Sequence, residues 1–151
     1  MMRFFLAAVL TASLGVAQTE REAVHGAYNA QFTITEGPAG VPAGYTFPAA
    51  FVLHSGGTLA AASSDPGDGP GCGVWARDLN GDLVLTFLSF QFNSMGAAGS
   101  AKIRVRLKYD AAHSVANGVW YLDLYDVNNT SAGFIRGTLT AAKMMVEAPP
   151  L

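Results

Sequence analysis

Residues 102–109, KIRVRLKY, and residues 119–126, VWYLDLYD, are the stretches that decide the fold of this chain. In the first stretch apolar and basic side chains alternate strictly, and in the second Trp120, Leu122 and Leu124 fall on one face. An alternation with a period of two predicts β-strands that bury one face and expose the other. The two stretches therefore predict an antiparallel hairpin with one face in an apolar core.

One register of this hairpin satisfies both of its faces. We predict that Leu107 lies opposite Trp120 on the buried face. The same register places Arg104 opposite Asp123 on the outer face, where opposite charges attract each other. A shift by one residue would expose the apolar face, so the pattern restricts the register.

The rest of the chain repeats this strand-and-turn pattern. Segments rich in Gly, Pro, Asn and Asp interrupt the apolar runs at 36–44, at 65–71 and at Asn80-Gly81, a strong hairpin signal. The predicted strands are residues 26–35, 47–54, 58–64, 72–77, 83–92, 101–109, 119–126 and 133–142. Eight short antiparallel strands in sequence fit an all-β fold, either an up-and-down barrel or a sandwich.

The first 17 residues have the three parts of a secretory signal peptide. Arg3 supplies a positive start, residues 4–10 are apolar, and residues 11–17 are small, with a cleavage site after Ala17. A membrane anchor is the alternative, but the apolar run is shorter than the roughly 20 residues that a spanning helix needs. We therefore expect a secreted or periplasmic protein with no membrane span, in which residues 18–151 form a single domain.

Composition argues against several classes of function. The 151 residues carry a net charge of −2, which is not the charge of a general nucleic-acid binder. The single cysteine, Cys72, excludes an intramolecular disulfide, a cysteine zinc site and a C-x-x-C pair. In an oxidising compartment Cys72 is either a buried, inert thiol, which we favour, or the site of an intermolecular disulfide. The sequence leaves the oligomeric state open.

Short motifs along the chain resemble those of small secreted bacterial lipocalin-like proteins. The motifs are GAY at 26–28, GTL at 57–59, GVW at 73–75, LTFLSF at 85–90 and GTL at 137–139. The resemblance implies a calycin-type, eight-stranded antiparallel up-and-down barrel with a cup-shaped interior.

In such a barrel the inward-facing apolar side chains would line the cup. The predicted lining residues are Phe32, Ile34, Phe51, Leu53, Val105, Leu107, Trp120 and Leu122. A cup of this kind binds a small apolar ligand mainly by burying its surface. The alternative is that these side chains fill the barrel, as in a structural or surface interaction protein.

An enzyme is the other alternative, because barrels of the allene oxide cyclase type shape a substrate for cyclisation or isomerisation in an apolar cup. That chemistry needs a polar group in the cup, and Tyr28, His54 and Tyr109 are the candidates. We favour a binding protein over an enzyme and expect no catalytic residue, cofactor or metal ion.

The acidic motifs and the basic row have structural explanations that we favour. The DLNGD motif at 78–82 lacks the later Gly and Glu of a calcium loop and predicts a hairpin turn. Asp65 and Asp68 lie in a Gly-rich segment, which favours a polar loop over a weak calcium site. The alternating basic residues of 102–108 favour a solvated outer face over a surface for anionic partners.

Overall fold

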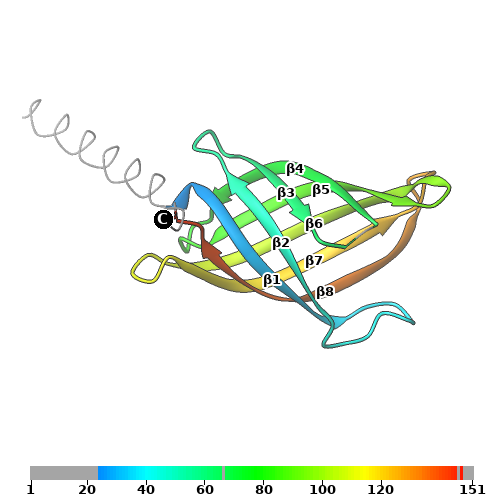
Figure 1. The fold of residues 1–151 in the computed structure, drawn as a ribbon, viewed down its shortest axis with the longest axis horizontal. Coiled ribbons are helices and arrows are strands. Elements are labelled where there is room, and N and C mark those ends of the chain that lie inside the picture. Colours follow the sequence, from blue (N-terminus) through cyan, green and yellow to red (C-terminus); the bar gives the residue numbers. More distant parts are fainter. Residues whose placement is uncertain (1–23, 66, 146, 148–151) are drawn as a thin grey trace, which may run out of the picture.

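The computed structural model describes residues 24–65, 67–145 and 147, and these residues form a closed antiparallel barrel (Figure 1). The strands are β1 (Gly26–Glu36), β2 (Thr46–Leu53), β3 (Thr58–Ser63), β4 (Asp68–Arg77), β5 (Leu83–Asn93), β6 (Gly96–Asp110), β7 (Val115–Tyr125) and β8 (Ser131–Lys143). Each strand pairs with the next, and β8 pairs with β1. The predicted all-β, eight-stranded up-and-down barrel is therefore confirmed, and the sandwich alternative is wrong. The predicted signal peptide, residues 1–17, lies outside the described residues.

The two faces of β6 and β7 are those that the sequence predicts. Along β6, Ile103, Val105 and Leu107 are buried, and the four basic residues between and beside them are exposed. On β7, Trp120 is buried inside the barrel. The period of two has therefore identified the inner face correctly.

The register of this hairpin differs from the prediction by two residues. Leu107 lies opposite Gly118, and Trp120 lies opposite Val105. The predicted pairing of Leu107 with Trp120 is wrong because the turn is shorter than expected and β7 begins at Val115, opposite Asp110. A shift by two residues leaves every side chain on its own face, so alternation alone cannot detect it.

The ends of two strands also differ from the prediction. β4 begins at Asp68 and β6 begins at Gly96, so parts of the predicted loop at 65–71 and of the segment between the predicted strands 83–92 and 101–109 are strand. A bulge accompanies each change, one between Asp68 and Gly71 and one at Gln91 and Phe92. Glycine and proline within a strand often mark a bulge rather than the end of the strand.

The interior of the barrel has two different halves. The packed half lies toward the connections 54–57, 78–82 and 111–114, and contains the largest fully buried side chains, among them Tyr28, Leu53, Leu83 and Leu107. The open half lies toward the connections 37–45, 64–67, 94–95 and 126–130. On β7 exposure rises toward this end, since Trp120 is buried and Leu122 is half-buried.

Candidate functional site

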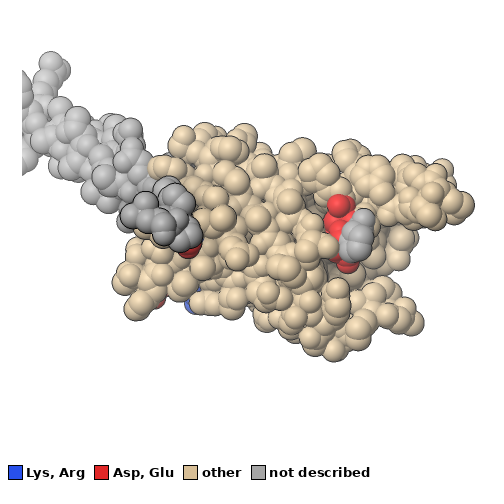
Figure 2. All heavy atoms as spheres, in the orientation of Figure 1, with Lys and Arg blue, Asp and Glu red and all other residues tan. Residues whose placement is uncertain are grey.

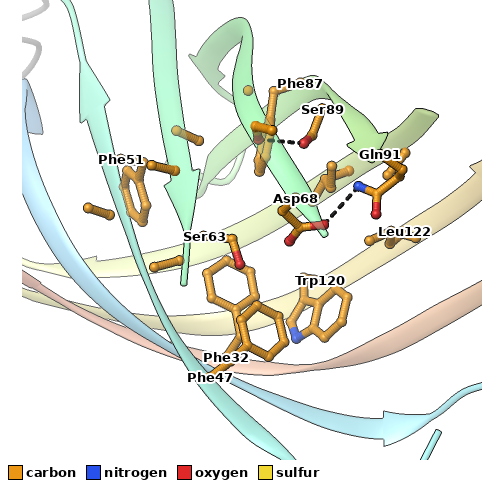
Figure 3. Close-up of a pocket in the computed structure, with 18 residues that line it drawn as sticks. Phe32, Phe47, Phe51, Ser63, Asp68, Phe87, Ser89, Gln91, Trp120 and Leu122 are labelled. Carbon is orange, nitrogen blue, oxygen red and sulfur yellow. Dashed lines mark hydrogen bonds between the residues drawn. The ribbon is translucent and has the colours of Figure 1, made fainter. Parts of the chain in front are cut away.

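The open half contains a hollow that is connected to solvent (Figure 3). Its cavity volume is about 60 Å³, which is well below the roughly 300–1,000 Å³ of typical small-molecule sites and indicates a slender space. The residues along its wall include Phe32, Phe47, Ala49, Phe51, Ala61, Ser63, Asp68, Phe87, Ser89, Gln91, Ala101, Trp120 and Leu122.

The hollow exists because small residues occupy inward positions of the strands in this half. Ala49, Ala61 and Ala101 lie on β2, β3 and β6, and Gly71 lies on β4. In the packed half the inward positions of the same strands carry larger side chains, such as Leu53 of β2. The size of the side chains, rather than a break in the alternation, therefore opens the interior.

An aromatic cluster of Phe32, Phe47 and Trp120 forms one side of the hollow (Figure 3). The rings of Phe32 and Phe47 are stacked, with centroids 5.4 Å apart. Both phenyl rings meet the indole of Trp120 edge-on, at 5.5 Å and 6.1 Å. The indole Nε1 donates a hydrogen bond to the carbonyl oxygen of Thr138 at 3.1 Å, which fixes the orientation of the ring.

Polar side chains lie across the barrel from this cluster, on β4 and β5 (Figure 3). The Nε2 of Gln91 donates a hydrogen bond to Oδ1 of Asp68 at 2.8 Å. The buried hydroxyl of Ser89 donates to the carbonyl oxygen of Gly69 at 2.8 Å. The hollow is therefore apolar with one polar side, and Asp68 is the one charged residue among those described along its wall.

The bulge in β4 is what turns Asp68 into the hollow. Asp68 pairs with Gln91 and Gly71 pairs with Ser89, so three steps along β4 match two steps along β5. Without the extra residue, Gly69 would lie opposite Gln91 and Asp68 would face outward. Bulges commonly redirect a side chain in this way. The sequence signal is the Gly69-Pro70-Gly71 interruption, which predicts a loop as readily as a bulge.

The structure places four of the eight predicted lining residues along this hollow. These are Phe32, Phe51, Trp120 and Leu122. The other four, Ile34, Leu53, Val105 and Leu107, are buried in the core but do not line the hollow. Sequence reasoning missed Phe47, Phe87 and all of the polar residues. The inward face of β5 was not predictable, because that strand is apolar on both faces.

The three candidate catalytic residues do not line the hollow. Tyr28 is fully buried in the packed half, where its hydroxyl donates to the carbonyl oxygen of Val24 at 2.5 Å. Burial, followed by the neighbouring Tyr109, raises the pKa of the Tyr28 phenol. The ring of Tyr109 meets that of Tyr28 edge-on at 6.4 Å. His54 is exposed after β2, and its backbone oxygen accepts a hydrogen bond from Trp75.

The outer surface carries the basic row, with acids beside it. Arg104 forms an ion pair with Asp123 and lies over the ring of Tyr121, and Arg106 lies 3.3 Å from Asp78. Cys72 also faces outward and is exposed, so the expected burial of this thiol is wrong. It lies on the outer face of β4, whose partner on β5 is the exposed Leu88.

Comparisons with known proteins add nothing to this geometry. A scan against protein-family models and a search of curated proteins both find no match for this chain. Within the described residues no helix is long and apolar enough to cross a bilayer. The same part of the chain has no group of three or more His, Cys, Asp or Glu residues that could hold a metal ion. The hollow therefore has to be interpreted from its own residues.

Proposed function

We propose that this chain is a secreted, lipocalin-like carrier that binds a small apolar molecule in the hollow of the open half. The observation that carries the proposal is an aromatic-lined space that communicates with solvent at one end of a closed barrel. Apolar surface that leaves water in such a space is the main source of affinity. The hollow favours a binding protein over a barrel whose interior is filled.

The dimensions of the hollow restrict the ligand to a flat ring or a short chain. The cavity volume is only about 60 Å³, so a bulky ring system does not fit below the mouth. The stacked and edge-on rings of Phe32, Phe47 and Trp120 offer flat faces and edges to a planar ligand. The end of the ligand with a polar group would remain near Asp68 and Gln91.

A simple ring compound tests the binding site. A benzyl group buries about 200 Å² of apolar surface, which at roughly 25 cal/mol per Å² contributes about 5 kcal/mol before association costs. Because association costs about 4 kcal/mol or more, benzyl alcohol should bind weakly, with a Kd of millimolar order or above, measurable by ligand-observed NMR.

Two neighbouring alanines on β3 provide a matched pair of variants. Ala61 lines the hollow, whereas Ala60 is exposed on the outer face of the same strand. Ala61→Phe should fill the hollow and abolish binding of benzyl alcohol, and Ala60→Phe should leave it unchanged. No binding by the wild-type protein, together with a cooperative thermal melt, would favour the filled-barrel alternative.

Export is a separate part of the proposal. It rests on the charge and hydropathy pattern of residues 1–17. Mass spectrometry of protein recovered from the periplasm or medium of a bacterial host should identify Gln18 as the first residue. Exported protein that still begins at Met1 would contradict the predicted cleavage.

A further inference from the structure

We infer that the hollow selects ligands carrying a protonated amine, so that its ligand class is a small aromatic or short-chain ammonium ion. This inference rests on the proposed binding function and specifies the chemistry of the same site. Three features of the described residues carry it: the carboxylate of Asp68, the aromatic cluster opposite, and the acidic mouth of the open half.

The carboxylate of Asp68 faces an apolar space, and the other described side chains along the wall are neutral. Oδ1 accepts a hydrogen bond from the amide of Gln91, and none of the ion pairs in the described part of the chain involves Asp68. The wall around it consists mainly of phenyl, indole and methyl groups. A ligand that fills the hollow removes water from this carboxylate, and an ammonium group on the ligand compensates for that loss.

The aromatic cluster attracts the same kind of group. Phe32 and Phe47 come from β1 and β2, and Trp120 comes from β7, so the rings face β4 and β5 across the barrel (Figure 3). The face of an aromatic ring attracts a cation, most strongly when the ring is that of tryptophan. An arylalkyl-ammonium or alkyl-ammonium ion could therefore pack against the rings and direct its charge to Asp68.

Among the described residues, the connections at the entrance to the open half carry acidic side chains and no basic ones. The connections 37–45, 64–67, 94–95 and 126–130 contain Asp65 and Asp126 as their charged residues among those described. Figure 2 shows acidic atoms in a hollow on a face that is otherwise almost without charged groups. This arrangement favours the approach of cations and opposes that of anions.

Other ligand classes fit these residues less well. A carboxylate or phosphate ligand would bring a second negative charge next to Asp68, which has no basic neighbour along the wall. A bare metal ion would have one carboxylate and neutral amide or hydroxyl groups, and no metal-binding group of three residues exists in the described part of the chain. An organic ammonium ion uses both the apolar and the acidic sides.

The test compares benzylamine, which is protonated at neutral pH, with benzyl alcohol, which has nearly the same shape and no charge. Affinities for the wild-type protein and for Asp68→Asn are measured by the same NMR titration. Asp65→Asn is the matched control, because it removes the same charge three residues earlier, in the connection before β4, at a residue that does not line the hollow. In this control the side-chain oxygen at position 65 can still accept the hydrogen bond from the amide of Gly67.

We expect the wild-type protein to bind benzylamine about tenfold more tightly than benzyl alcohol, as a charge-assisted contact allows. Asp68→Asn should remove this preference and bring the two affinities to within about twofold of each other, whereas Asp65→Asn should preserve the preference.

Equal affinities of the wild-type protein for the two probes would overturn the inference while leaving the proposed carrier function intact. An equal loss of the preference for benzylamine in Asp65→Asn and Asp68→Asn would also overturn the inference. The carboxylate of Asp68 would then act only from a distance, as that of Asp65 does. Binding of neither probe would instead reject the carrier function itself. If Asp68→Asn does not fold, the affinities of the wild-type protein for the two probes test the inference.

Discussion

The packed half and the open half of this barrel are built from the same eight strands with the same alternation, yet one is filled and the other is hollow. Leu53 ends β2 fully buried in the packed half, and Ala49, two inward positions earlier, lines the hollow. Alternation therefore decides which side chains face inward, and their size decides whether a space remains. The hollow in this barrel is therefore created by local reductions in side-chain volume.

The largest expected difference between the halves comes from truncating one leucine in each. Leu107→Ala removes a fully buried side chain from the packed half and should lower the free energy of unfolding by about 2–5 kcal/mol. Leu122→Ala acts on a half-buried leucine beside the hollow and should cost about 1 kcal/mol. Urea denaturation measures both values. Equal losses would contradict the difference in packing between the halves.

Enlarging one alanine in each half should give a smaller difference in the free energy of unfolding. Ala116 is fully buried in the packed half, so Ala116→Leu should overpack the interior and cost about 1–3 kcal/mol. Ala61→Leu places the same added volume in the hollow and should change the free energy of unfolding by less than about 1 kcal/mol. Thermal melts of the two variants provide the comparison. A greater loss for Ala61→Leu would mean that the hollow collapses in solution.

Tyr28 tests the packed half through a single hydrogen bond. Tyr28→Phe leaves the carbonyl oxygen of Val24 without its phenol donor and should cost about 1 kcal/mol. Because burial raises the pKa of Tyr28, the folded protein holds this proton more tightly than the unfolded chain does. The contribution of the neutral Tyr28 phenol to the free energy of unfolding is therefore complete below about pH 10 and is lost as the pH rises above that value. A wild-type protein whose stability between pH 10 and 11 falls no faster than that of Tyr28→Phe would contradict this.

The smallest effect is expected in the turn between β6 and β7, outside both halves. Nδ1 of His113 lies 2.6 Å from a carboxylate oxygen of Asp110, and this hydrogen bond raises the pKa of His113 above 6.5. The pair stabilises the folded state fully between pH 3.8 and pH 6.5, and this contribution is lost as the pH rises through the pKa of His113 in the folded protein or falls through the lowered pKa of Asp110. An NMR titration of Asp110→Asn should return the pKa of His113 toward 6.5. An unchanged value would exclude Asp110 as the cause.

Most of the fold could be predicted from alternation and turn residues. All eight strands and the inner face of β6 and β7 follow from the pattern of apolar and polar residues. The register of the hairpin of β6 and β7 could not be predicted, because a shift by two residues preserves both faces. Gly118 was an available signal, since a Cβ there would lie 1.9 Å from the carbonyl oxygen of Arg106. The close approach of the two strands at that point requires glycine.

Less of the candidate site could be predicted. Phe32, Phe51, Trp120 and Leu122 were identifiable because they face inward, but inward position does not distinguish a wall from a filled core. The position of Asp68 depends on a bulge that a Gly-Pro-Gly sequence does not distinguish from a loop. Local sequence thus describes single strands well, and the site depends on which residues oppose each other across the barrel.

The two tryptophans allow the most direct test of the central claim, because each half contains one. The indole N–H of Trp120 bonds to Thr138 beside the hollow, and that of Trp75 bonds to the backbone of His54 in the packed half. Both give separate signals in a ¹H–¹⁵N NMR spectrum. Titration of the wild-type protein with benzylamine should shift the Trp120 signal in a saturable manner and leave the Trp75 signal unchanged. A shift of Trp75 alone, or of neither indole, would contradict a ligand site in the open half.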